Sequence, residues 1–360
     1  MQLTRKKKPT EITGLDIEAG SIAATEVRAN GSLQVTGCAI GPLAAGVVHE
    51  GEIRDTGELA AALKSLFNQH KLSKRVRLGI ANQQVLVRML RLPAIENPEE
   101  MGAAVRFQAQ EQIPMPLDQA VLEHQVVGGV PAEEGSVPQV DVVVVAARRE
   151  MVASFLEPLR RAGLEPVGVD LAAFGMIRAL ADQAVPPETL EPGQRPSDAT
   201  LFCNVGDVTN LAVARGRSCL FTRVSTAGIE PIAARLAATR GLSAEHAGQW
   251  LDYVGLERPT EEIEGDPETV REARAALEDG VGALLDEVRR SLDFYGAQEG
   301  ALPVGRVILS GSGSAIPGLA ARIEERLGAE IRPVRPPALG GFDDASAARL
   351  TLSYGLGLES

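Results

Sequence analysis

A turn rich in glycine and serine near the end of the chain is well suited to contact a nucleotide. Residues 307–309 predict a buried strand, Ser310, Gly311, Ser312 and Gly313 follow it, and a helix is expected from about Pro317. Glycine lets backbone N–H groups approach a ligand because no Cβ stands in the way, and a helix start favours anions. Tight packing between a strand and a helix needs the same residues, so the turn alone leaves both interpretations open.

Two hairpins share one layout in different parts of the chain. In the first, residues 14–17 enter as an apolar strand that carries Asp16 at its tip, and residues 22–27 leave as a second strand. Near residue 200 the layout recurs, with Asn204 at the place of Asp16 and residues 210–214 as the returning strand. Small residues between apolar runs are typical of hairpin turns. The recurrence predicts two halves built on one plan.

Composition indicates a folded α/β chain that is not attracted to polyanions. The 360 residues suggest about two domains, and 36 Lys and Arg against 48 Asp and Glu give a net charge of −12. That charge disfavours nucleic acid or anionic lipid as partners. Cys38, Cys203, Cys219 and four scattered histidines lack the spacing of metal ligands. Without a signal peptide or an apolar span, the expected location is the cytoplasm, with no direct membrane insertion.

Helical and strand-like patterns alternate in both halves, so we expect an α/β architecture with mixed sheets. A helix is expected from Pro98 to Gln112, between Asn97 as its N-cap and Pro114 as its stop. The predicted parts are a flexible basic tail (1–12), a first half (13–182) with an insertion subdomain at about 94–140, a proline-rich connection (183–198), and a second half (199–360) with a small subdomain at about 235–295.

The order hairpin, hairpin, glycine-rich turn on two similar halves resembles the actin-like ATPase superfamily. The resemblance implies an actin-like (ribonuclease H-like) two-lobed α/β fold with a nucleotide cleft, and ATP and Mg²⁺ as cofactors. In that superfamily the two hairpin turns grip the phosphates from opposite sides, and the late glycine-rich turn lies against the adenosine. The cofactor-binding residues that the resemblance implies are Asp16, Gly20, Ser21, Asn204, Gly206, Thr209, Glu287, Arg290, Gly311, Ser312 and Gly313, with Asp16 also linked to the metal.

Several residues depart from the superfamily pattern around this cleft. Glu18 and Ala23 stand where a glycine and a lysine are usual, and Asn204 stands where an aspartate is usual. An added carboxylate repels phosphate and a missing ammonium removes a phosphate partner. Asp170 is the candidate for orienting the attacking water, but Ala172 lacks the second acid expected beside it. We therefore expect weak Mg-ATP binding that depends on Asp16, and at most a slow ATPase.

Three segments narrow the resemblance to the PilM family of type IV pilus assembly proteins. These segments are residues 105–118, which end a helix in Ile-Pro-Met-Pro-Leu-Asp, residues 289–295, and residues 308–319 with 323–327. The resemblance implies a cytoplasmic adaptor at the inner face of the inner membrane. Its implied partner is a PilN-like inner-membrane protein, whose short N-terminal tail lies in a groove of the first half. A pilus motor ATPase and self-association are further candidates.

The helix Pro98–Gln112, its proline-rich exit and residues 87–93 are expected to form the walls of that groove. Proline fixes φ, so the turn Pro114-Met115-Pro116 would keep a shallow groove preformed and lower the entropic cost of binding. A helix that packs on its own subdomain and merely stops at Pro114 is the competing interpretation. The candidate partner-binding residues are Arg88, Leu92, Pro93, Arg106, Phe107, Gln110, Ile113, Pro114 and Pro116.

Two other functions share the expected fold. A sugar or acid kinase would need a catalytic base and polar sugar-binding loops, and no convincing set is present. A filament-forming division protein like FtsA would carry an amphipathic anchor at its C-terminus. Residues 350–360 have no basic face and instead indicate a core helix or turn.

Overall fold

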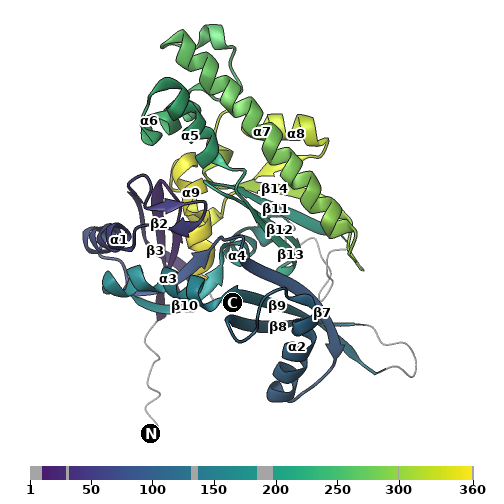
Figure 1. Ribbon diagram of the computed structural model, residues 1–360. Coiled ribbons are helices and arrows are strands. Elements are labelled where there is room, and N and C mark those ends of the chain that lie inside the picture. The colour runs from purple at the N-terminus through teal and green to yellow at the C-terminus, as the bar shows by residue number, and fades with distance from the viewer. Residues whose placement is uncertain (1–9, 30–31, 131–136, 185–197, 299, 359–360) are drawn as a thin grey trace.

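The computed structural model describes residues 10–29, 32–130, 137–184, 198–298 and 300–358. The basic run at residues 5–8 and nearly all of the proline-rich connection lie outside the described residues. Figure 1 shows two α/β lobes with a smaller subdomain attached below them. Among the described helices, none combines the length and apolarity needed to cross a bilayer.

The first lobe is built on a five-stranded sheet in the order β10-β6-β1-β2-β3. Its strands are β1 (Thr10–Ile17), β2 (Ser21–Ala29), β3 (Leu33–Pro42), β6 (Arg75–Ile80) and β10 (Glu165–Leu171), and a short hairpin, β4 (Val48–His49) and β5 (Glu52–Ile53), lies beside them. Helices α1 (Thr56–His70) and α3 (Arg149–Arg161) pack on one face through Leu59, Leu63 and Leu159, which bury Leu15 and Leu78.

The second lobe repeats this plan with the sheet order β13-β12-β11-β14-β15. Its strands are β11 (Ala199–Val205), β12 (Thr209–Arg215), β13 (Ser218–Ser225), β14 (Val304–Ser310) and β15 (Ile331–Pro333). Its helices are α5 (Ile229–Arg240), α6 (Ala244–Val254), α7 (Pro267–Gly296) and α8 (Leu319–Leu327), with short 3-10 turns η2 (Thr260–Glu262), η3 (Ser312–Ala315) and η4 (Pro337–Leu339). Helix α7 covers one face of the sheet through Val281, Leu284 and Val288.

Two helices lie between the lobes and join them. Helix α4 (Ala172–Ala184) packs Met176 and Leu180 against the second sheet, while α9 (Asp344–Gly357) lies against β1 and β2 of the first. The two helices cross so closely that a side-chain carbon on Gly355 would lie 1.9 Å from the carbonyl oxygen of Gly175. The end of the chain is thus a core helix, as its sequence indicates, and the expected two-lobed fold is confirmed.

The insertion subdomain is a three-stranded antiparallel sheet in the order β7-β9-β8 with one helix. Its elements are β7 (Val85–Pro93), α2 (Pro98–Gln112), β8 (Ala120–Val130) and β9 (Gln139–Arg148). The subdomain is wider than the predicted 94–140, because β7 and most of β9 belong to its sheet. The side chain of Asn97 accepts from the N–H of Glu99 and caps α2, so this helix begins and ends where the sequence predicts.

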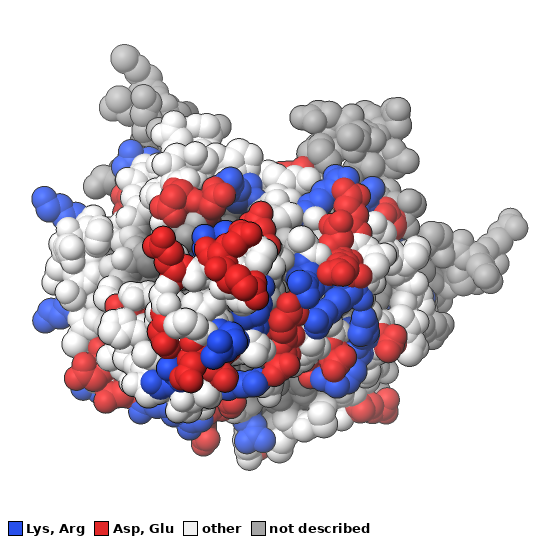
Figure 2. All heavy atoms as spheres, turned by 90° about the horizontal axis from the view of Figure 1, so that it is seen from above, with Lys and Arg blue, Asp and Glu red and all other residues white. Residues whose placement is uncertain are grey.

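Charged side chains of both signs are interspersed on the face seen from above in Figure 2. Acidic side chains gather near the centre of this view, next to basic ones.

Candidate functional site

The turns of the β1–β2 and β11–β12 hairpins touch each other between the lobes. The carboxylate of Asp207 accepts a hydrogen bond of 3.0 Å from the backbone N–H of Gly20. In return, the carboxyl group of Glu18 packs against Gly206 of the second turn. A side-chain carbon on Gly206 would lie 2.1 Å from Oε1 of Glu18, so only glycine fits there. The two predicted hairpins therefore meet. The contacts are made by Glu18 and Asp207, which are not among the binding residues predicted from the sequence.

Arg349 of α9 holds the first hairpin from the side of the helix. Its side chain is only 7 % exposed and forms an ion pair with the buried carboxylate of Asp16. Its Nε lies 2.7 Å from Oγ of Ser21 and 3.2 Å from Oε2 of Glu18, and its Nη2 donates to the carbonyl oxygen of Ser21. The predicted metal-linked acid and the predicted turn serine are thus both bound to one guanidinium.

The second hairpin and the glycine-rich turn meet at the ends of β11 and β14. Nδ2 of Asn204 lies 3.2 Å from Oγ of Ser310, and the hydroxyl of Thr209 donates to the carbonyl oxygen of Ala227. Gly311 has a φ of 87°, and a side-chain carbon there would lie 2.6 Å from the carbonyl oxygen of Val205.

Gly313 packs in the same way, because a side-chain carbon added at this position would lie 2.6 Å from Cγ1 of Val205. Ser312 begins the η3 turn between the two glycines. The glycines thus allow close packing against β11, which is the second of the two interpretations that the sequence left open.

Three predicted residues lie away from the hairpin turns. Asp170, in the edge strand β10, forms an ion pair of 2.5 Å with Arg178 of α4. Glu287 pairs with Arg290 at 2.5 Å and with Arg223 of β13 at 3.4 Å. Among the described contacts, none joins these residues to either hairpin turn or to the glycine-rich turn. The structure therefore gives Asp170, Glu287 and Arg290 local ion-pair partners.

The space between the hairpins is small. A cavity of about 20 Å³ remains, and Asp16, Glu18, Asp207 and Glu230 line it together with apolar residues such as Val48. A cavity needs roughly 10–15 Å³ to hold one water molecule, so this one holds about one.

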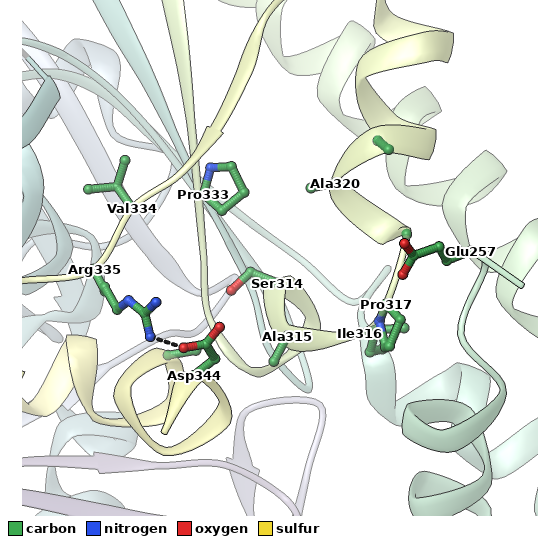
Figure 3. A pocket seen from close by; sticks show the side chains of 13 residues that line it. Glu257, Ser314, Ala315, Ile316, Pro317, Ala320, Pro333, Val334, Arg335 and Asp344 are labelled. Carbon is green, nitrogen blue, oxygen red and sulfur yellow. Dashed lines mark hydrogen bonds and ion pairs between the residues drawn. The ribbon is translucent and has the colours of Figure 1, made fainter. Parts of the chain in front are cut away.

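A larger cavity of about 430 Å³ lies on the outer side of the glycine-rich turn. Figure 3 shows it between Ser314, Pro317 and Pro333, with Arg335 paired to Asp344 at its edge. No described residue of either hairpin lines this second space.

Burial and neighbouring acids raise the pKa of Glu18. It rises from 4.5 to about 8, chiefly because the carboxyl group is removed from water; Arg349 opposes the rise, and Asp207 and Asp16 add to it. Burial also raises the pKa of Asp207. At the mouth of the cleft, the Nδ1 of His49 lies 2.6 Å from Oε1 of Glu230, and this hydrogen bond raises the pKa of His49. The ionisable groups at the contacts between the lobes thus hold their protons more tightly in the folded protein than in the unfolded chain.

Stability should therefore fall as the pH rises. A carboxyl group whose pKa is raised by folding stabilises the fold fully below its ordinary value of 4.5, and this contribution is lost as the pH rises through about 8. Thermal unfolding midpoints measured from about pH 5 to pH 9 should show this loss for the wild type. Glu18→Gln, which mimics the protonated group and cannot ionise, should show a shallower decline. Parallel curves for both proteins would contradict the shift.

The predicted partner-binding residues fall into three groups. Leu92 and Ile113 are buried with Met101, Val105 and Ala109 in the core between α2 and its sheet, so they serve packing and cannot contact a peptide. Arg88 lines cavities of about 350 and 520 Å³ between β7 and β13. The remaining members are exposed: Pro93, Arg106, Phe107, Gln110, Pro114 and Pro116. The helix thus packs on its own subdomain, as the competing interpretation has it.

Two α/β lobes that each carry a hairpin at the cleft, joined by crossing helices, define an actin-like protein. Solved structures agree: EutJ of Carboxydothermus hydrogenoformans has a TM-score of 0.52 at 14% identity, covering 98% of this chain and 92% of its own. MreB 5 of Spiroplasma citri bound to AMPPNP has a TM-score of 0.51 at 11% identity, covering 97% and 95%. The chain belongs to the PilM family, because residues 14–339 match the family described as type IV pilus assembly protein PilM.

A solved PilM–PilN type IV pilus biogenesis complex contains a chain similar to this one along nearly its whole length. Its TM-score is 0.77 at 28% identity, and the match covers 97% of this chain and 98% of that chain. The family expected from residues 105–118, 289–295 and 308–327 is thereby confirmed.

The hairpins of this chain do not fit the phosphates of a nucleotide in the arrangement described. The turn N–H of Gly20 is already bound to the carboxylate of Asp207, Glu18 packs against Gly206, and Arg349 holds Asp16. A cavity of about 20 Å³ has no room for a triphosphate, and the acids Asp16, Asp207 and Glu230 at its wall add repulsion.

Proposed function

We propose that this chain is an adaptor of type IV pilus assembly that binds the cytoplasmic N-terminal tail of a PilN-like inner-membrane protein. The observation that carries the proposal is the similarity to a chain of a PilM–PilN complex over 97% of this chain. The adaptor would be held at the inner face of the membrane by this partner. The role needs no catalytic base, in keeping with the ion pair that holds Asp170.

We place the tail between the insertion subdomain and α4. Helix α2 covers only one face of the β7-β9-β8 sheet, and Val143 on the other face borders a cavity of about 280 Å³. Phe174 and Ile177 of α4 form its far wall, while Gln125 of the edge strand β8 and Arg178 add polar groups. This channel offers polar and apolar groups side by side, which suits an extended peptide whose side chains alternate in direction.

A matched pair of substitutions tests this placement. Gln125 lines the cavity and Gln110 lies on the outer face of α2, and both side chains are exposed, so tryptophan should be tolerated at either position. Gln125→Trp should fill the channel and weaken binding of the partner's tail peptide at least about tenfold by calorimetric titration, a change of about 1.4 kcal/mol. Gln110→Trp should bind like the wild type.

The opposite result would move the tail to the outer face of α2, where Arg106, Phe107 and Gln110 are exposed. Circular dichroism should confirm that both variants are folded. Failure of the wild type to bind the tail of the PilN-like protein from the same genome would overturn the adaptor function itself.

A further inference from the structure

Each of the two hairpin turns receives an acidic side chain from the other. The carboxylate of Asp207 in the second turn accepts a hydrogen bond of 3.0 Å from the N–H of Gly20 in the first. The carboxyl group of Glu18 in the first turn packs so closely on Gly206 of the second that a side-chain carbon there would lie 2.1 Å from Oε1. We call this arrangement of Glu18, Gly20, Gly206 and Asp207 the hairpin clasp.

The clasp uses the groups that a turn offers to an anion. Successive backbone N–H groups in a turn form a concave site for phosphate or carboxylate oxygens. Here both turns are already supplied, because each receives a carboxyl group from the other lobe. The contact of Glu18 with Gly206 is so close that no ligand atom fits between them.

Arg349 compensates part of the acidic charge in the clasp. Its side chain is buried, and its Nε lies 3.2 Å from Oε2 of Glu18 while it pairs with Asp16 on its other side. A metal ion that bridges phosphates to an acidic hairpin supplies positive charge at such a position. In this chain a fixed guanidinium from α9 supplies it.

A second contact between the lobes lies near the clasp. The carboxylate of Glu230, at the start of α5, accepts from the N–H of Glu50 at 3.1 Å and pairs with His49. Both partners belong to the β4–β5 hairpin of the first lobe. The lobes are therefore joined at two places by side chains of the chain itself.

We infer that the hairpin clasp and Arg349 replace a metal-bound nucleotide in this chain, so that the lobes are held closed without a ligand. The inference concerns the cleft only and does not depend on partner binding. Glu18, Asp207 and Arg349, which make the hairpins unsuitable for a triphosphate, then have the structural role of joining the lobes.

Amide hydrogen exchange and thermal unfolding of the full chain test the inference. Without nucleotide, the amide of Gly20 should be protected in the wild type. Asp207→Ala should speed its exchange by about 10- to 100-fold, the range expected for a lost hydrogen bond to a charged group. Glu257→Ala, which removes an exposed acid at the larger cavity, should leave this amide unchanged.

Millimolar Mg-ATP should leave the unfolding midpoint and this amide of the wild type unchanged. A rise in the midpoint that Asp16→Ala abolishes would overturn the inference, because it would show that nucleotide enters the site. Exchange at residue 20 that is unaffected by Asp207→Ala would also overturn it. Neither result would touch the adaptor function, because binding of the tail peptide is measured separately.

Discussion

Replacing Arg349 with methionine is expected to lower the free energy of unfolding by about 3–5 kcal/mol. The guanidinium is buried and serves Asp16, Glu18 and Ser21 together. Removing one partner of a buried ion pair leaves an uncompensated charge in a medium of low dielectric constant, which is the costly part. Methionine keeps most of the volume, so the loss should come from charge and hydrogen bonds.

Urea unfolding of matched variants separates this effect from ordinary surface ion pairs. Arg326 of α8 pairs with Glu278 but is 38 % exposed, so Arg326→Met should cost only about 0–1 kcal/mol. Adding Asp16→Asn to Arg349→Met should recover part of the loss, because the buried acid that lost its partner is then neutral. Equal losses for the two arginine variants would show that Arg349 does not compensate buried charge.

Much of the fold could be predicted because its signals are local. The capping Asn97 and the stop at Pro114 bound α2, and the small residues around Gly20 and Gly206 mark the two hairpin turns. Turn and cap chemistry is set by residues a few positions apart, so a sequence displays it directly. The recurrence of one hairpin layout then predicted two lobes.

The electrostatics of the site could not be predicted because its partners are distant in sequence. Arg349 and Asp16 are separated by 333 positions, and Glu18 and Asp207 belong to hairpins of different lobes. One local feature indicates a buried role for Arg349: it is the single cation in the largely apolar segment 347–356. A buried charge usually has a partner, so that segment indicated an acid somewhere, without saying which.

Ile113 carries a local signal for packing. Positions 101, 105 and 109 repeat every four residues along α2, and 113 continues the same face. That period places Ile113 with the core-facing residues Met101, Val105 and Ala109, where the structure has it. The helical period thus predicts the position of Ile113 correctly, whereas the proline-rich exit predicts a groove residue.

The crossing of α4 and α9 leads to a second large effect. A side-chain carbon on Gly355 would lie 1.9 Å from the carbonyl oxygen of Gly175 and 3.0 Å from Cβ of Ala179. The nearest atoms belong to backbone, which cannot turn aside as a flexible side chain does. Gly355→Ala should therefore force the two central helices apart and lower the free energy of unfolding by about 3 kcal/mol, at the upper end of the usual cost of overpacking.

The control for Gly355→Ala is the same change at a helical glycine with free space. Gly248 lies within α6, and nothing stands within 4 Å of the position that its side-chain carbon would take. Alanine there should raise the free energy of unfolding by about 0.5–1 kcal/mol, because glycine loses more backbone entropy on folding. The two substitutions have the same chemistry and opposite expected signs, so urea unfolding decides between packing and helix propensity. A gain in stability for Gly355→Ala would mean that the lobes are not joined by backbone contact at this crossing.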